Sequence, residues 1–281
     1  MIYLLILLFT IGFIPVHSQT IYPNPYNLLY IQPSLEDIDK LPIIAEYVLK
    51  NLTSTNDRLT GHPGYYRATE YLYKILYELT SGLTILDNYT VVVPIDLESY
   101  LEINGTEIKV YPIWPSGGVP VNTECSGKII VARDLDDLSG KDLNGSILLL
   151  DMSIDWKWLW LLDPHLGVKA ILFYDSSEVV YSRMYDKYLD TPVNLPLGFI
   201  STMELYNRYG LTINDLEGSI GYLKLSSKWI ETNASNIIAY IPGSNHEYKI
   251  VLMTHYDSWT PAIGYAPGAM DALAPAYLVY Y

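Results

Sequence analysis

The chain has 281 residues, of which 50% are hydrophobic and 17% charged, so it can bury a core in one large domain or two ordinary ones. Its formal net charge of −14 argues against nucleic-acid phosphates and anionic membrane surfaces as partners. The single cysteine, Cys125, cannot form an internal disulfide, so packing must stabilise the fold.

Residues 1–18 are predicted to be a secretory signal peptide. The stretch "MIYLLILLFTIGFIPVHS" has no charged side chain, and its apolar run is short for a membrane span. The usual basic region is missing, so an uncleaved N-terminal anchor is the alternative. Five N-x-S/T sequons follow, at Asn51, Asn88, Asn104, Asn144 and Asn233. Together they favour an exported, glycosylated protein that is secreted or extracellular.

Two amphipathic helices are predicted between Ser34 and Gly82. Ser34 has the spacing of a helix N-cap, and Gly82 is typical of a helix end. The hydrophobic residues at helical spacing are Ile38, Leu41, Ala45, Val48 and Leu52 in the first helix, and Ala68, Tyr71, Leu72, Ile75, Leu76 and Leu79 in the second. Residues 83–95 then predict one or two strands.

The middle of the chain predicts a self-contained β-rich module. Turn signals separate its short β-like runs, which are residues 127–132, 145–152, 169–175 and 195–201. A brief helix in "TMELYNRYG" should end at Gly210.

Two strongly apolar strands are predicted after this module, at residues 236–243 and 248–258. Runs as apolar as these suit central strands that helices cover on both faces. The whole chain therefore favours an α/β class.

The residues with a pattern for metal chemistry are His255, Asp257 and Asp271. His255 and Asp257 are two apart at a strand end, so their side chains share a face where α/β sheets place ligands. Asp257 can accept the Nδ1–H of His255 and leave Nε2 for a metal, and a flexible Gly/Pro loop can return Asp271 to the same place. The alternative is a His–Asp hydrogen bond that caps a strand end. His62 is interpreted as an ordinary loop residue, because no acidic partner has a matching spacing.

A family resemblance rests on these residues. "NIIAYIPGSNHEYKIVLMTHYDS" and "PGAMDALA" resemble peptidase family M28, and "DRLTGHPGYYRATEYLYKIL" resembles that family's Arg/Gly loop and following helix. The middle module resembles the protease-associated (PA) domain that secreted M28 members carry as an insertion. The implied fold is an α/β, incomplete M28-type mixed sheet with flanking helices, interrupted by a β-rich PA-like domain. Its parts are 34–95 and 233–281 for the M28-like domain and 96–232 for the insertion.

The resemblance also implies a function. His255 would be a zinc ligand, Asp257 the carboxylate that orients it, and Asp271 the bridge between two zinc ions. These ions activate water to hydrolyse peptide bonds in peptide or protein substrates. The general base and later ligands follow this region in the family, so the chain is expected to be truncated, inactive alone, and completed by a missing C-terminal half or partner chain. The alternative is a non-catalytic secreted M28 homologue or a PA-domain binding protein.

Overall fold

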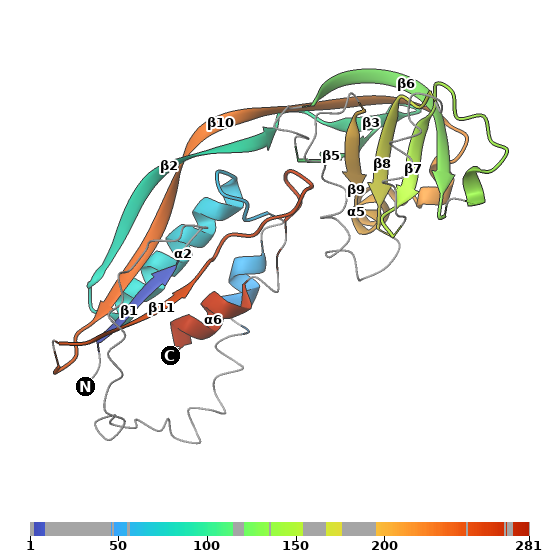
Figure 1. Cartoon of the computed structure of the whole chain (residues 1–281). Helices are drawn as coiled ribbons and strands as arrows, with labels where there is room; N and C mark the ends of the chain where they lie inside the picture. Colours follow the sequence, from blue (N-terminus) through green and yellow to red (C-terminus); the bar gives the residue numbers. More distant parts are fainter. Residues whose placement is uncertain are drawn as a thin grey trace. The chain divides into compact units, whose positions relative to one another are not determined.

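The structure is a computed structural model, shown in Figure 1. It describes residues 3–8 (backbone only), 46, 48–54, 57–114, 121–134, 136–153, 167–175, 195–245, 247–266, 268 and 272–280. The chain divides into two compact units. Unit 1 contains Met1–Val91, Glu231–Trp259 and Ala266–Tyr281, and unit 2 contains Val92–Ile230 and Thr260–Tyr265.

Unit 1 is built on a mixed sheet. Strand β1 (Tyr3–Leu8) pairs antiparallel with β10 (Ile220–Ile241) and parallel with β11 (Lys249–Thr254). Strand β2 (Thr84–Asp96) also pairs with β10. Both β2 and β10 continue into unit 2.

Helices pack against β10 to form the core of unit 1. Helix α2 (Pro63–Leu79) confirms the second predicted helix, and α6 (Leu273–Tyr280) lies near the end of the chain. Of the first predicted helix, residues 48–53 are helical, while Ser34 to Ala45 lie outside the described residues. The core includes Val48, Leu52, Tyr65, Ala68, Leu72, Leu76, Ala234, Ile237, Ala239, Tyr256, Ala272, Ala276 and Val279.

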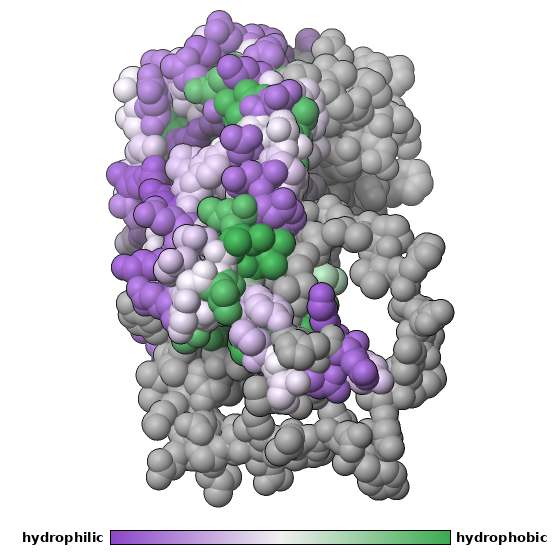
Figure 2. All heavy atoms as spheres, turned by 90° about the vertical axis from the view of Figure 1, so that its left-hand side faces the viewer, coloured by the Kyte–Doolittle hydropathy of each residue, from purple (hydrophilic) through white to green (hydrophobic). Residues whose placement is uncertain are grey.

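Strand β11 differs from the prediction. It ends at Thr254 instead of continuing to residue 258, and Ile250, Val251 and Met253 are 38%, 45% and 61% exposed. The expectation of a strand covered by helices on both faces is therefore wrong for β11 among the described residues. The reason is that the strand residues buried in this core come from β10. Figure 2 shows one face of the molecule, on which hydrophobic residues form a patch, coloured green.

Unit 2 contains the predicted β-rich module. Its strands are β3 (Tyr100–Ile103), β4 (Thr106–Lys109), β5 (Tyr111–Pro112), β6 (Asn122–Ala132), β7 (Ile147–Asp151), β8 (Ala170–Tyr174) and β9 (Leu197–Ile200). Strands β6 to β9 are parallel, which confirms the four predicted runs, although β6 begins earlier than expected. Strand β5 pairs antiparallel with β9, and β6 and β3 both pair antiparallel with β10.

Both faces of this parallel sheet are buried. On β7, Ile147 and Leu149 enter one hydrophobic cluster, while Leu148 and Leu150 enter the other. Double burial explains why these strands are continuously apolar in sequence. Short helices flank the sheet: η3 (Asp136–Leu138), α5 (Thr202–Tyr209) and η5 (Ile213–Leu216). Helix α5 ends as predicted at Gly210, whose φ of 68° is left-handed.

The loop between Asp257 and Asp271 is more ordered than its Gly/Pro content suggested. Residues Thr260–Tyr265 belong to unit 2, where the backbone N–H of Ile263 donates to the carbonyl of Pro112 (2.8 Å). The ring of Tyr265 lies 5.1 Å from that of Tyr111. This loop is therefore a packed connection, and the expectation of a flexible one is wrong for these residues.

Two features bear on the expectation of export: the sequon asparagines and the length and hydrophobicity of the helices. The five sequon asparagines are all exposed, which makes them accessible but does not test whether they carry glycans. Among the described residues, no helix is long and apolar enough to cross a membrane.

Candidate metal site

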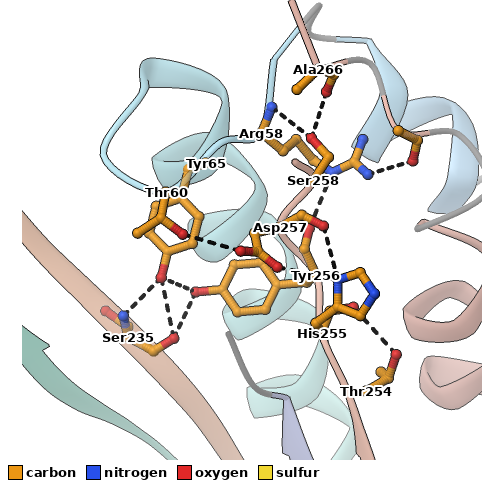
Figure 3. A network of polar contacts seen from close by, with 11 residues as sticks. Arg58, Thr60, Tyr65, Ser235, Thr254, His255, Tyr256, Asp257, Ser258 and Ala266 are labelled. Atoms are coloured by element: carbon orange, nitrogen blue, oxygen red, sulfur yellow. Dashed lines mark hydrogen bonds and ion pairs between the residues drawn. The ribbon is translucent and has the colours of Figure 1, made fainter. Parts of the chain in front are cut away.

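The candidate site lies in unit 1, just past the end of β11. Burial alternates along this segment, so His255 and Asp257 share one side and Tyr256 takes the other. His255 is 49% exposed and Asp257 14% exposed on one side, and Tyr256 between them is fully buried on the other. As predicted, the side chains of His255 and Asp257 lie on the same side and contact each other (Figure 3).

Asp257 fixes the ring of His255. Nδ1 of His255 lies 3.2 Å from Oδ1 of Asp257 and 3.1 Å from its backbone carbonyl oxygen. Both oxygens are acceptors, so the geometry favours the tautomer with the proton on Nδ1. That tautomer leaves the lone pair of Nε2 for a metal ion, on an exposed imidazole.

Thr60 in turn holds Asp257. The hydroxyl of Thr60 donates to Oδ2 of Asp257 (3.2 Å), so both carboxylate oxygens are engaged. Thr60 is only 7% exposed and comes from the loop before α2. The carboxylate that orients His255 is thus held by a segment almost 200 residues away in sequence.

Arg58, from the same loop, holds the backbone around the site. Its side chain is fully buried, and its guanidinium donates to the carbonyl oxygens of Tyr256 (3.1 Å), Leu52 (3.1 Å) and Gly268 (2.7 Å). Its backbone N–H donates to the hydroxyl of Ser258 (3.2 Å). One cation therefore ties together the end of a helix, the strand end with the His–Asp pair, and the returning loop.

A network of tyrosines anchors the inner side of the site. The hydroxyl of Tyr256 lies 2.8 Å from that of Tyr65 and 2.8 Å from the carbonyl oxygen of Ser235, and Thr69 donates to it (2.9 Å). The two tyrosine rings stack with centroids 5.2 Å apart. Burial raises the pKa of both phenols, so they stay neutral at ordinary pH. This network fixes Tyr256, and with it the outward direction of its two neighbours.

His62 has a role that the sequence interpretation missed. It is 8% exposed at the N-terminus of α2, and its Nδ1 contacts Oδ2 of Asp57. Oδ1 of Asp57 also accepts from the backbone N–H of Leu59 (2.8 Å). The sequence interpretation considered only partners with the spacing of metal ligands, and so it missed Asp57, which the loop brings back against His62. The pair stabilises the loop that carries Arg58 and Thr60.

Cys125 has no feature of a reactive thiol. It lies half-buried on β6, and burial raises the pKa of its thiol, with Lys169 acting weakly in the opposite direction. A raised pKa disfavours the reactive thiolate.

The described residues include one side chain, that of His255, with the chemistry of a metal ligand. Asp271 lies outside the described residues, and among those described no group of three His, Cys, Asp or Glu side chains is placed to hold a metal. The donor chemistry of His255 nevertheless fits zinc, since a neutral imidazole with a carboxylate on Nδ1 is a common zinc ligand. The structure therefore shows an exposed imidazole whose Nδ1 is held by a carboxylate, and no complete set of metal ligands among the described residues.

With a large mixed sheet, few helices and a His–Asp pair at the end of a strand, the chain has an α/β fold of the M28 peptidase type. It is similar to two structures of BSAP, a zinc aminopeptidase from Bacillus subtilis, at 16% and 19% identity and a TM-score of 0.51 for each. Each match covers 85% of this chain and 57% or 56% of that chain. At this identity the likeness concerns the fold alone.

A peptidase M28 precursor from Shewanella amazonensis is also similar, at 20% identity and a TM-score of 0.49 over 80% of this chain and 57% of that chain. The chain thus spans less than two thirds of the length of the structures it matches. No model of a protein family matches the sequence, and no curated protein matches it.

Proposed function

We propose that the chain is part of a secreted, zinc-dependent peptidase of the M28 aminopeptidase type. The observation that carries the proposal is the orientation of His255 by Asp257 at the end of β11. The fold shared with zinc aminopeptidases supports the same class of reaction.

His255 and Asp271 are proposed as zinc ligands, with Asp257 orienting His255. In the complete site Asp271 would bridge two zinc ions. Bound zinc supplies Lewis acidity and lowers the pKa of water, so that water can attack a peptide carbonyl. The chain's own contribution is positional: Thr60 holds Asp257, and Asp257 holds the imidazole of His255.

The remaining ligands and the general base are proposed to come from a further part of the protein. Two observations support this: the chain spans 56–57% of the BSAP chains, and the metal-ligating types among the described residues form no complete group. In this proposal unit 2 is the PA-like insertion. Its limits in the structure, apart from residues 260–265, are 92–230, close to the expected 96–232.

A peptidase assay tests the proposal. The 281-residue chain alone should release no nitroaniline from leucine 4-nitroanilide with added zinc, because it has no described general base. A longer protein that includes the segment encoded downstream of Tyr281 should cleave this substrate. That cleavage should need zinc and should be lost on chelation and in His255→Ala.

Three outcomes would contradict the proposal. Turnover by the chain alone would show that no further segment is needed. Turnover that His255→Ala leaves unchanged would exclude the proposed ligand. A longer protein without turnover, or a gene with no downstream segment supplying Glu, Asp and His ligands, would favour the non-catalytic alternative.

Secretion is proposed from the leader-like residues 1–18 and the exposed sequons. The structure places Tyr3–Leu8 as strand β1, so cleavage near Ser18 would remove a strand that pairs with β10 and β11. Expressed in a eukaryotic secretory system, the protein should appear in the medium with an N-terminus near Gln19. N-terminal sequencing checks this, and a secreted protein that keeps Met1 would show that β1 is part of the mature fold.

A further inference from the structure

A cavity of about 500 Å³ lies in unit 2, at the carboxyl ends of the parallel strands β6, β7 and β8. In α/β sheets this edge is where ligands bind. The cavity is separate from the candidate metal site, since all its lining residues come from 133–214. Nothing in the proposed peptidase chemistry uses it.

Strand register brings charged groups into this cavity. Asp151, the last residue of β7, is in register with Tyr174 on β8. The last pair between β6 and β7 is Ala132 with Leu150, so Arg133 follows next to Asp151. Asp151 and Tyr174 are therefore paired neighbours, Arg133 directly follows the end of β6, and all three line the cavity.

A second carboxylate, that of Asp175, lines the same cavity. Its Oδ1 accepts from the backbone N–H of Thr202 (2.7 Å), the first residue of α5. Burial raises the pKa of Asp175 against the hydrogen bonds from Thr202 and from its own backbone, which lower it, and the negative charge of Asp151 adds a smaller rise. Burial, with a smaller contribution from the carboxylate of Asp151, raises the pKa of Tyr174 to about 12. The protein thus holds two interacting carboxylates at a partly desolvated site.

The nearby cation does not neutralise these carboxylates by direct pairing. The guanidinium of Arg133 donates to Oδ1 of Asn214 (3.0 Å). Oδ1 of Asp151, a residue only 4% exposed, accepts from the backbone N–H of Ser153 (2.7 Å). The charged side chains that line the cavity are two aspartates and one arginine, a formal charge of −1, which favours a cationic ligand.

The rest of the lining indicates what kind of cation fits. Among the described residues, no group of three His, Cys, Asp or Glu is placed to hold a metal ion, so this carboxylate pair is not a metal site of that kind. The cavity is also lined by Tyr206, Leu211 and Ile213. Aromatic and aliphatic side chains suit an alkyl chain next to an ammonium group, with the tyrosine rings adding cation–π attraction.

We propose that this cavity binds an alkylammonium group of a peptide, with Asp151 and Asp175 as its charge partners. The group is either the α-ammonium of a peptide N-terminus or the ε-ammonium of a lysine side chain. In a peptidase such a site would hold part of a peptide substrate. The proposal does not depend on catalysis, because binding is measured without turnover.

Calorimetric titration of the full chain tests the proposal with three probes. Alanyl-alanine amide carries only an α-ammonium, acetyl-lysine amide carries only an ε-ammonium, and acetyl-norleucine amide is the neutral control. At least one ammonium probe should bind more tightly than the neutral probe, and which one binds identifies the source. Asp151→Asn and Asp175→Asn should each weaken this binding about tenfold, since the negative charge of the acceptor is lost.

Matched variants separate charge from damage to the fold. Both asparagines keep an amide oxygen that can accept the existing backbone hydrogen bond. Glu107→Gln removes an exposed carboxylate elsewhere in unit 2 and should leave binding unchanged. Arg133→Gln removes a positive charge and should strengthen binding severalfold. The proposal is overturned if neither ammonium probe binds better than the neutral one, if both aspartate variants bind like the unmodified chain, or if Arg133→Gln weakens binding.

Discussion

Replacing Arg58 by alanine is expected to lower the free energy of unfolding by about 3–5 kcal/mol. The guanidinium is fully buried and donates to the carbonyl oxygens of Leu52, Tyr256 and Gly268. Alanine cannot replace these donors, so buried carbonyl groups lose their partner, and each such loss costs about 1–3 kcal/mol. A domain is typically stable by only about 5–15 kcal/mol, so this change could leave little folded protein.

Urea unfolding followed by circular dichroism measures the effect. Arg67→Ala is the matched control, because Arg67 is exposed on α2 and its removal should change stability by less than about 0.5 kcal/mol. Arg58→Lys should fall between the two, since lysine keeps the charge but not the planar fork of donors. Equal stability of Arg58→Ala and Arg67→Ala would show that Arg58 does not hold the site together.

The effect should extend to metal binding. Arg58 holds the carbonyl of Tyr256, the residue between His255 and Asp257, and that of Gly268, which precedes Asp271 by three positions in the sequence. Both parts of the chain that carry proposed ligands therefore depend on the same guanidinium. Without these hydrogen bonds the two segments would be less rigid, and the proposed ligands would lose the fixed geometry that metal binding needs.

The sequence predicted the His–Asp pair but not its supports. His255 and Asp257 were predictable because alternation along extended backbone places residues two apart on one face. Arg58 and Thr60 reach the site from a distant loop, and the partners of the Arg58 guanidinium are backbone carbonyls, which leave no pattern in side-chain type. The resemblance to the family's Arg/Gly loop marked this segment in the sequence, but only the folded structure gives the burial of Arg58 and its contacts.

The strands also divide into those that the local sequence predicts and those that it does not. Those of the parallel sheet in unit 2 were predictable because burial on both faces makes their sequences continuously apolar. Strand β10 was predicted only from residue 236, although it begins at Ile220. Its first part contains polar residues such as Ser226 and Lys224, and it is held extended by pairing with β3 and β6, a tertiary effect that local pattern does not report. The role of Asp271 remains a prediction, because it lies outside the described residues.

Replacing Asp257 by asparagine is expected to weaken zinc binding by roughly 10–100-fold. The carboxylate accepts from Nδ1 of His255 and from the hydroxyl of Thr60, and these two contacts fix the imidazole with Nε2 outward. Asparagine has a similar shape but presents one oxygen and one NH2 group, so it cannot keep both acceptor contacts. The ring loses both its fixed tautomer and the basicity that a neighbouring carboxylate gives to a ligand.

Zinc affinity, measured by competition with a chromogenic chelator, tests the central claim most directly. The purified chain should bind zinc, Asp257→Asn should bind it more weakly, and His255→Ala should lose more affinity than Asp257→Asn, because a ligand itself is removed. His246→Ala, which changes a histidine outside the proposed site, should bind like the unmodified chain. If His255→Ala binds zinc as tightly as the unmodified chain does, the His–Asp pair only caps the end of a strand and the proposed metal site is wrong.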